Sequence, residues 1–470
     1  MTVPLYKLFS DSYKKGEITV FLSLILASLL GLMSVLIESA RLSLMRMNIE
    51  SVMDSAIHSC FGEYDRKLYD RYDLLFIDSS YRGENSADIE NVASHLAGYI
   101  NVNVDYTDTK ANGEWYREKL CDVTSKGYVF ASDNNGEVFK EQAMRYIEKY
   151  AGYKNITGIN MSRPEIEGIR KTDFFSEWDS LLAAVDAYGL PLMNPGKIVR
   201  GMVLKPEEFL KGCTLNNIGF KDIPSKRSLN QGNSLNKIKK YQGTEDAFVE
   251  YLMQKCGCFT EKNTDQQLNA ELEYIVYGYD NDKDNMCCVL NNLMEIRESD
   301  NLRCIKGDAG KMEQAWKKAV EIVMFHMIDP LCPPDPVLIR LVRDTIIYAW
   351  AYAESAIDVS RLLNRGLCQV NKSSADISLS LRELLNFKSK LNGSGGSGIS
   401  YKTYIGVFVS QTADMFRRER CMDIIEVNCR VFHNSSFRID GCVEYFEAKV
   451  KLTSGYGYSH EITRDFYMNK

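Results

Sequence analysis

The chain has 470 residues, of which 45% are hydrophobic and 26% charged, and its formal net charge is −6. This composition is that of ordinary globular protein, and the length predicts about three domains. A chain with a negative net charge and no long basic run lacks the clustered cations that neutralise phosphates. These features argue against a dedicated nucleic-acid-binding protein.

The chain opens with a short basic leader, residues 1–16, followed by an uninterrupted apolar run. The run from Ile18 to Ile37 has twenty residues without a charge or a proline. An α-helix of that length spans about 30 Å, the thickness of a bilayer's hydrocarbon core. A secretory signal has a shorter apolar region and a small-residue cleavage site, and a buried core helix rarely carries such a run. We therefore predict a retained transmembrane helix over 17–37.

Cationic residues flank the span unevenly. Lys7, Lys14 and Lys15 precede it, whereas Arg41 and Arg46 follow it among acidic residues. Because cationic flanks favour the cytoplasmic side, we predict a cytoplasmic N-terminus, a single pass through the cell membrane and an extracytoplasmic body. The lipid bilayer is thus the first expected partner.

Two side-chain patterns predict how this helix packs. Within the span, Ser23, Ala27 and Gly31 recur at every fourth position and lie on one face, where small residues let two helices approach closely in lipid. Beyond the span, apolar residues repeat at intervals of three and four, which predicts an amphipathic stalk helix over 38–70. The apolar positions are Leu42, Met45, Ile49, Val52 and Ala56. This stripe needs a partner surface, either the body of the same chain or the stalk of a second copy.

The region 71–243 is predicted to be a mixed α+β region outside the membrane. The expected strands are 72–78 and 126–131, and the expected helices are 86–102, 137–150 and one around 174–182. Asp133 or Asn134 is expected to form the turn or the cap before the second helix. The polar segment 225–243 is expected to be an exposed loop and a candidate boundary between two halves of the body.

The region 244–470 is predicted to be rich in helix and to end in a β-hairpin. Apolar spacing near 3.6 residues predicts helices at 270–277, 287–296, 312–328 and 336–363. Pro336 sets the start of the last one, because proline is accepted in the first helical turn. Charged residues inside it, such as Arg340 and Glu354, argue against a second membrane span. Alternating residues over 446–452, followed by a glycine-rich turn, predict the closing hairpin.

The expected fold class is therefore α+β. A single N-terminal transmembrane helix continues as an amphipathic helix, and a mixed extracytoplasmic domain follows and ends in a C-terminal β-hairpin.

Two short motifs match ligand-binding loops in part. Gly393–Gly398 fits G-x-G-x-x-G, but the segment 381–391 before it has helical and basic character where a dinucleotide loop needs a strand. We expect a flexible Gly/Ser loop instead. Asp280, Asp282 and Asp284 have the spacing that begins a calcium loop, but the glycine and glutamate that complete such a loop are missing. We expect a solvated turn that caps the next helix, and we predict neither a cofactor nor a metal ion.

The sequence contains no recognisable catalytic motif. Serine-nucleophile and zinc-peptidase patterns are absent, and Glu271 and Glu273, two residues apart on a helix, do not face one another. We expect these two carboxylates on a solvated surface. The thirteen cysteines include Cys256–Cys258 and Cys287–Cys288 but no zinc-type spacing. Most are expected to be small buried hydrophobic residues, with some disulfide pairing left open, and the chain is not expected to be an enzyme.

The N-terminal pattern resembles that of a known family. The segment from Gly16 to Asp65, with Lys14 and Lys15 before it, resembles the N-terminal segment of TadE/TadG-like proteins of the tight-adherence pilus system. The stretches 271–299 and 349–363 and the closing hairpin resemble the large extracytoplasmic domain of unknown function in the form found in Gram-positive bacteria. The resemblance implies a pilin-like structural or assembly protein that contacts other pilin-like or membrane assembly proteins through its N-terminal helix.

The same resemblance implies a peptidase cleavage between Gly16 and Glu17. Pilins usually carry a glutamate at the fifth position after the cut, where this chain has Phe21. Two interpretations stay open: a cleaved subunit that enters a filament, and a permanently tethered assembly factor. A function of another class also stays open, namely a signal-anchored ligand-binding or sensor module with a cleft in the body.

Overall fold

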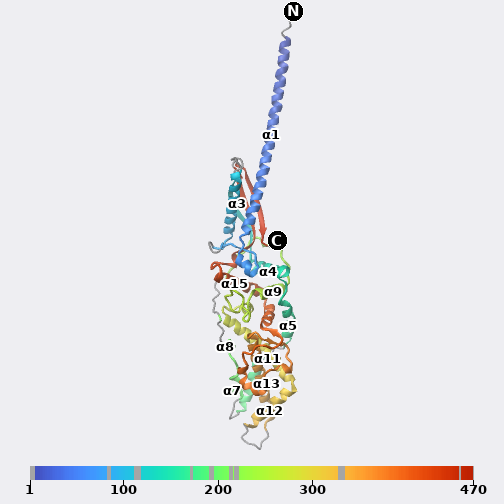
Figure 1. The fold of residues 1–470 in the computed structure, drawn as a ribbon, viewed down its shortest axis with the longest axis vertical. Coiled ribbons are helices and arrows are strands. Elements are labelled where there is room, and N and C mark those ends of the chain that lie inside the picture. The colour runs from blue at the N-terminus through green and yellow to red at the C-terminus, as the bar shows by residue number, and fades with distance from the viewer. Residues whose placement is uncertain are drawn as a thin grey trace.

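The computed structural model describes residues 6–81, 86–110, 118–169, 173–189, 195–210, 215, 222–325, 334–454 and 457–468. The molecule is elongated (Figure 1). A long helix projects from one end, a small sheet and a second helix lie beside its lower part, and a helical body extends below them. The fold class is α+β, as the sequence predicts.

The elements of the first half include the anchor helix and most of the parts around it. They are α1 (Tyr6–Phe61), α2 (Arg66–Tyr72), β1 (Ile77–Asp78), α3 (Ile89–Lys110), β2 (Glu118–Phe130), α4 (Asp133–Tyr146), the π-helix η2 (Ile147–Ala151), α5 (Ile156–Gly168), α6 (Phe174–Ala187), α7 (Pro195–Arg200) and α8 (Pro206–Phe209).

The second half begins with helices and ends with strands. Its elements are α9 (Glu245–Lys255), α10 (Glu271–Tyr277), α11 (Asp282–Gly307), α12 (Ala309–Phe325), α13 (Pro336–Leu363), β3 (Leu367–Cys368), the 3₁₀ segment η6 (Leu381–Lys390), β4 (Ile399–Ser400), α14 (Tyr401–Gln411), α15 (Asp414–Phe432), β5 (Cys442–Ser454) and β6 (Ser459–Tyr467).

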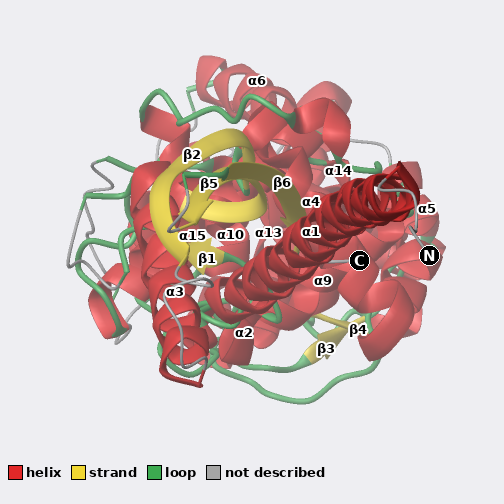
Figure 2. Ribbon diagram, turned by 90° about the horizontal axis from the view of Figure 1, so that it is seen from above, coloured by secondary structure: helices red, strands yellow, loops and turns green. Residues whose placement is uncertain are grey.

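β5 is the central strand of an antiparallel sheet. It pairs with β2 on one side and with β1 and then β6 on the other, so that Val450 lies opposite both Val123 and Ile462. The alternating residues Phe446, Ala448, Val450 and Leu452 are all buried, which confirms the predicted hairpin. α1 and α3 lie next to these strands at the upper end of the molecule (Figure 2).

α13 is the central helix of the lower body. It begins and ends at the predicted residues, and Asp335 caps its start by accepting a hydrogen bond from the Val337 amide at 2.8 Å. Within α13, Asp358 accepts from the guanidinium of Arg297 at 2.9 Å and from Lys372 at 2.8 Å, all three being buried. The buried carboxylate of Asp358 is therefore paired with cations inside the body.

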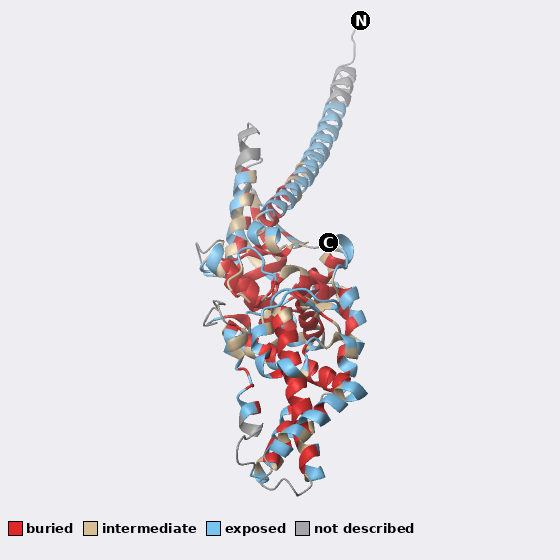
Figure 3. Ribbon diagram, turned by 60° about the horizontal axis from the view of Figure 1, so that its bottom comes forward, coloured by how far each residue is buried: buried red, intermediate tan, exposed pale blue. Residues whose placement is uncertain are grey.

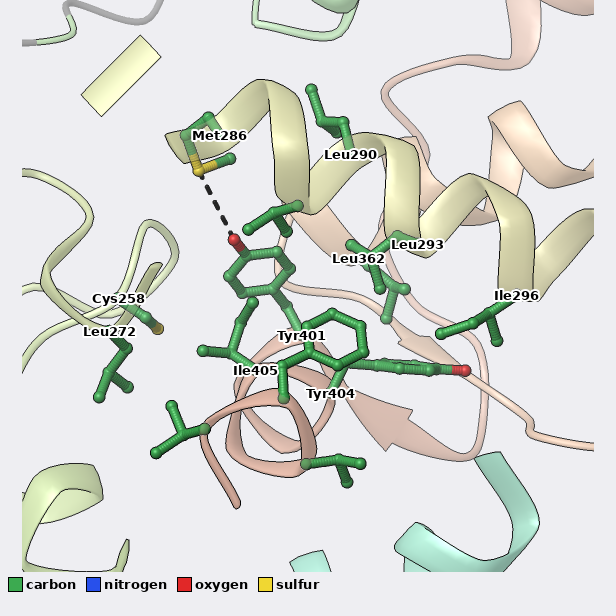
Figure 4. Packing of buried hydrophobic residues seen from close by; sticks show 14 of the residues in the cluster. Cys258, Leu272, Met286, Leu290, Leu293, Ile296, Leu362, Tyr401, Tyr404 and Ile405 are labelled. Carbon is green, nitrogen blue, oxygen red and sulfur yellow. Dashed lines mark hydrogen bonds between the residues drawn. The ribbon is translucent and has the colours of Figure 1, made fainter. Parts of the chain in front are cut away.

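The core between α11, α13 and α14 is close-packed and mostly apolar. Figure 4 shows Leu293 of α11 beside Leu362 of α13 and on the side of the Tyr401 and Tyr404 rings. Tyr401 also directs its hydroxyl toward the sulfur of Met286, 3.6 Å away. This same hydrophobic cluster runs from α2 to β5 and includes residues on both sides of the 225–243 loop.

The predicted strand 72–78 is shorter than expected. Tyr72 ends α2, Asp73 takes a left-handed conformation with φ of 53°, and only Ile77 and Asp78 pair with β5. In between, the side-chain amide of Gln142 takes the place of a neighbouring strand. Its oxygen accepts from the Leu75 amide at 2.8 Å, and its nitrogen donates to the Leu75 carbonyl at 2.7 Å.

Two of the helices, one strand and one turn predicted for the first half are confirmed, with different bounds for the helices and the strand. The helix expected at 86–102 is α3, the strand expected at 126–131 is the end of the longer β2, and the helix expected at 137–150 is α4 with η2. Asn134 and Asn135 form the predicted turn in left-handed conformations. Asp133 fixes this turn by accepting the amides of Phe130 and Gly232, both at 2.8 Å.

Candidate functional site: the anchor helix and a basic cavity

α1 changes from exposed to buried along its length. It is a single helix of 56 residues, and its apolar N-terminal part projects free of the body while its last turns are enclosed (Figure 3). Among the described helices it is the one long and apolar enough to cross a membrane. Ser23, Ala27 and Gly31 are all exposed in the projecting part. A β-carbon added at Gly31 would meet no atom within 4 Å, so this glycine has no packing role within the chain.

The proposed cleavage point lies within the same helix. α1 begins at Tyr6, ten residues before Gly16, and continues without a break through Glu17. Both residues are exposed. The structure therefore leaves the Gly16–Glu17 bond uncovered by the body.

The predicted stalk stripe is mostly buried, and its partner is the body of the same chain. Met45, Ile49, Val52 and Ala56 are each 5% exposed or less, whereas Leu42, nearer the projecting part, is 37% exposed. The last three buried residues form a hydrophobic cluster that also draws on α3 and the inner face of β5. α1 ends at Phe61, so the stalk helix is shorter than the expected 38–70.

Strand β6 runs along the stalk and contacts it at several levels. Near the sheet's lower end, the rings of Phe61 and Phe466 lie 4.3 Å apart between centroids. Farther up, Arg464 donates to Asp54 at 2.8 Å. At the top, the guanidinium of Arg41 lies 5.7 Å from the centre of the Tyr458 ring. The hairpin thus follows α1 almost to the end of its apolar segment.

A cavity of about 630 Å³ opens where the sheet meets the helical body. It lies between α4 with η2, the 237–241 segment, the start of β5 and the end of β6. Five cationic side chains line it, and they are Arg145, Lys149, Lys237, Lys239 and Lys240. Sequence reasoning missed this site because its cations come from two segments about ninety residues apart, and the short basic stretch 237–240 meets Arg145 and Lys149 only in the folded chain.

The cavity also contains three carboxyl groups, which differ in burial. Glu444 is 5% exposed and accepts a hydrogen bond from Gln142 at 2.5 Å. Burial raises the pKa of Glu444 to about 8, an effect only partly offset by Gln142 and Arg145. Burial also raises the pKa of Glu141. The third carboxyl group, that of Asp465, belongs to the last part of β6.

Glu271 and Glu273 do not lie on a solvated surface, contrary to the sequence-based expectation. Both are completely buried, and burial raises the pKa of each to about 7. Their carboxylates accept backbone amides of a neighbouring turn, and Tyr401 donates to Glu273 at 2.7 Å. Helix periodicity predicts that they point apart, but it does not show that α10 is enclosed on several sides.

The Asp280–Asp284 turn caps the following helix, as predicted. Asn281 accepts from the Asp284 amide at 2.8 Å at the start of α11. Asp282, however, is fully buried rather than solvated, and it accepts the amides of Asn269 and Ala270. In the part of the chain that the structure describes, no group of three or more His, Cys, Asp or Glu residues is arranged to hold a metal ion.

The segment Gly393–Gly398 is exposed, and two of its four glycines pack closely against the backbone of β3. A β-carbon at Gly396 would lie 2.3 Å from the carbonyl oxygen of Leu367, and one at Gly398 would lie 2.3 Å from that of Cys368. Both glycines have positive φ angles, which other residues rarely adopt. The segment before them is the 3₁₀ segment η6 rather than a strand, so the dinucleotide-binding context is missing here.

The described cysteines are free thiols, and most are buried as predicted. Those that are buried are Cys60, Cys256, Cys258, Cys304, Cys368, Cys421, Cys429 and Cys442. Burial raises the pKa of Cys60 to about 12 and that of Cys258 to about 11. Such thiols stay protonated at neutral pH and are poor nucleophiles.

The model of a family of unknown function, DUF5702, matches residues 197–454, more than half of the chain. The chain belongs to this family. No curated protein and no solved structure matches the sequence.

The DUF5702 match excludes the anchor helix and covers only part of the basic cavity. It includes α9 to α15, the buried Glu271 and Glu273, and β5 up to its last residue, Ser454. The anchor α1, its partner α3 and the strand β6 lie outside the matched range. The basic cavity therefore combines DUF5702 residues, such as Lys239 and Glu444, with flanking ones.

Proposed function

We propose that this protein is a membrane-anchored extracytoplasmic structural or assembly component, of the pilin-like type that serves tight-adherence pilus and secretion systems. The observation that carries the proposal is the continuity of α1, which is at once the apolar rod and a core element of the body. A helix of this kind joins body and bilayer rigidly, because no flexible linker separates them. A rigid connection suits a component that positions or transmits contacts between the membrane and an external assembly.

The free part of α1 is the surface proposed for partner proteins. The stalk stripe is already covered by α3 and the sheet, so a second copy has no access to it. The projecting segment is uncovered on all sides, including the face of Ser23, Ala27 and Gly31. In lipid, close approach at such a face is the main source of helix association. We propose that other pilin-like or membrane assembly proteins pack there.

The proposed orientation places the N-terminus in the cytoplasm and the body outside. Lys14 and Lys15 motivate it through the preference of cationic flanks for the cytoplasmic side. Protease added to intact cells, after removal of the wall, should digest the body and leave the anchor. Protection of the body in intact cells, with digestion only after lysis, would show that the orientation is reversed.

N-terminal sequencing of the membrane-extracted protein separates the two forms of the proposal. A chain that starts at Glu17 supports a processed subunit, because removal of the cationic leader lets the rod leave the bilayer. A chain that starts at Met1 or Thr2 supports a permanently tethered assembly factor. Phe21, which stands where pilins usually carry glutamate, favours the tethered form.

A second candidate function is an anchored extracytoplasmic ligand-binding module. The basic cavity favours it, because concave sites with converging polar groups are where ligands bind. The two functions are distinguished by which substitutions matter. Changes at the Gly31 face should disturb assembly in the first case, and changes at Lys149 or Lys239 should disturb ligand binding in the second.

A further inference from the structure

We propose that the basic cavity binds an oxyanion, either free phosphate or a phosphodiester group of an anionic polymer. The proposal deepens the second candidate function and rests on it, but it does not depend on the anchor or on its orientation. The cavity is large enough, at about 630 Å³, to take a phosphate with a neighbouring polyol unit.

The lining of the cavity has more cationic than acidic side chains. Lys149, Lys239 and Lys240 form no ion pair with the part of the chain that the structure describes. Lys237 has one long contact, 3.7 Å from Glu447, and Arg145 lies over the Tyr241 ring at 5.0 Å. Two acidic residues, Glu141 and Asp465, also line the cavity, and Glu141 interacts electrostatically with Arg145 and Lys240. The five cations outnumber these two residues, and a partly enclosed site with an excess of cations concentrates anions.

Glu444 lines the cavity and would repel a bound anion if its carboxyl were ionised. Its carboxyl is buried, and the groups that face it are Gln142, Arg145 and Glu141. Since the pKa of Glu444 is about 8, the group is protonated at pH 7 and can donate a hydrogen bond. Gln142 cannot turn away, because both ends of its amide are engaged by the Leu75 backbone. The cavity thus offers cations together with a neutral donor, which suits an oxyanion.

Anion binding to the full-length protein in a neutral detergent tests the proposal. Titration calorimetry with inorganic phosphate and with poly(glycerol phosphate) should detect both ligands. The triple variant Lys149→Gln, Lys239→Gln, Lys240→Gln should weaken binding at least tenfold. The control triple Lys317→Gln, Lys318→Gln, Lys388→Gln removes the same charge from exposed sites outside the cavity and should change affinity less than twofold.

A comparison of the ligands identifies the source of the phosphate. Polymer that binds at least tenfold more tightly than phosphate, per phosphate group, supports a polymeric ligand, and equal affinities support free phosphate. Equal weakening by the two triple variants would overturn the proposal, since it would mean that only net charge matters. Absence of phosphate binding by a folded wild-type protein would also overturn it.

A pH series provides an independent check with sulfate, whose charge is constant between pH 6 and 9. Wild-type affinity should fall several-fold from pH 7 to pH 9 as Glu444 ionises. Glu444→Gln replaces the carboxyl by a hydrogen-bond donor that cannot ionise, so it should remove that fall. A wild-type affinity for sulfate that does not change over this range would show that Glu444 does not face the anion.

Discussion

Glu271 and Glu273 each accept one backbone amide of the same turn: Glu271 from Gly257 at 2.7 Å and Glu273 from Phe259 at 2.9 Å. Glu271 and Glu273 are two positions apart in α10, and their partners Gly257 and Phe259 are also two positions apart in the turn. Both carboxylates are fully buried, so they hold the turn where water has no access. They serve as structural anchors of the body.

Glu271→Ala should lower the free energy of unfolding by about 2 kcal/mol or more, because it leaves the buried Gly257 amide without an acceptor. It also removes one of the two acceptors of the Asn428 side-chain nitrogen, which keeps its hydrogen bond to Tyr72. Urea denaturation of the full-length protein in detergent, followed by tryptophan fluorescence, measures this change. Glu261→Ala is the control in the same turn, where an exposed ion pair with Lys402 is lost, and it should cost less than about 1 kcal/mol. Equal losses of stability in the two variants would show that the buried hydrogen bonds of Glu271 do not contribute more than an exposed ion pair.

Stability should depend on pH because several buried carboxyls have raised pKa values. The pKa is about 7 for Glu271 and Glu273 and about 8 for Glu298 and Glu444. In the unfolded chain these groups ionise near their ordinary pKa of about 4.5, so between pH 4.5 and 8 the folded state binds more protons. Their contribution to the free energy of unfolding is therefore fully present below about pH 4.5 and is lost as the pH rises to about 8.

Melting temperatures of the full-length protein should accordingly be higher at pH 5 than at pH 8. Glu298 offers the sharpest test, since neither of its buried oxygens has a hydrogen-bond partner among the described residues. Glu298→Met should raise the melting temperature at pH 8 and reduce the difference between the two pH values. A wild-type protein more stable at pH 8 than at pH 5 would contradict the assignment of these pKa shifts.

The sequence predicted the features that depend on local pattern. The bounds of α13 follow from Pro336 and apolar spacing, and the hairpin follows from alternation along 446–452. The stalk stripe follows from the same kind of periodicity. Each of these signals lies within one segment, so no knowledge of distant contacts is needed.

The features that the sequence did not predict depend on contacts between distant segments. Leu75 lacks a strand partner because Gln142, sixty-seven positions later, supplies the hydrogen bonds. The basic cavity exists because Lys149 and Lys239 come together only in the folded chain. Likewise, periodicity along α10 gives the relative direction of Glu271 and Glu273 but not what covers them.

Docking of the stalk onto the sheet should be sensitive to charge at its buried face. Ala56 is completely buried between α3 and the sheet, and Ser55 beside it is exposed. Ala56→Glu should detach the stalk, because the new carboxylate would lie in an apolar cluster without a partner. Limited proteolysis should then cut within 42–61, whereas Ser55→Glu should leave the wild-type pattern. Protection of the stalk in both variants would contradict the docking.

Helix association in the membrane should depend on the small-residue face. Gly31→Ile should weaken self-association of the span by about 1 kcal/mol or more, as measured in a two-hybrid membrane assay. The substitution leaves the fold of the chain unchanged, because nothing lies within 4 Å of the position. Leu29→Ile, on the opposite face of the helix, is the control and should have no effect. Association of Gly31→Ile at the wild-type level would show that the face is not an interface.

The tip of the hairpin should lie at the membrane surface in the proposed orientation. Arg41 is four residues beyond Ile37, which is about 6 Å along a helix, and its guanidinium lies 5.7 Å from the Tyr458 ring centre. Tyr458 is exposed, and aromatic rings of this kind favour the headgroup region. The side chain at position 458 is therefore expected within reach of the lipid.

Tyr458→Trp, reconstituted in vesicles that contain brominated lipid, should show more quenched fluorescence than the wild type with its four tryptophans. Tyr150→Trp is the matched control, because Tyr150 is 79% exposed in η2 within the helical body, away from the projecting end of α1. It should add fluorescence that the lipid does not quench. Equal quenching of the two added tryptophans would mean that position 150 lies as close to the lipid as position 458. That result would contradict the proposed placement of the hairpin tip at the membrane and of the body away from it.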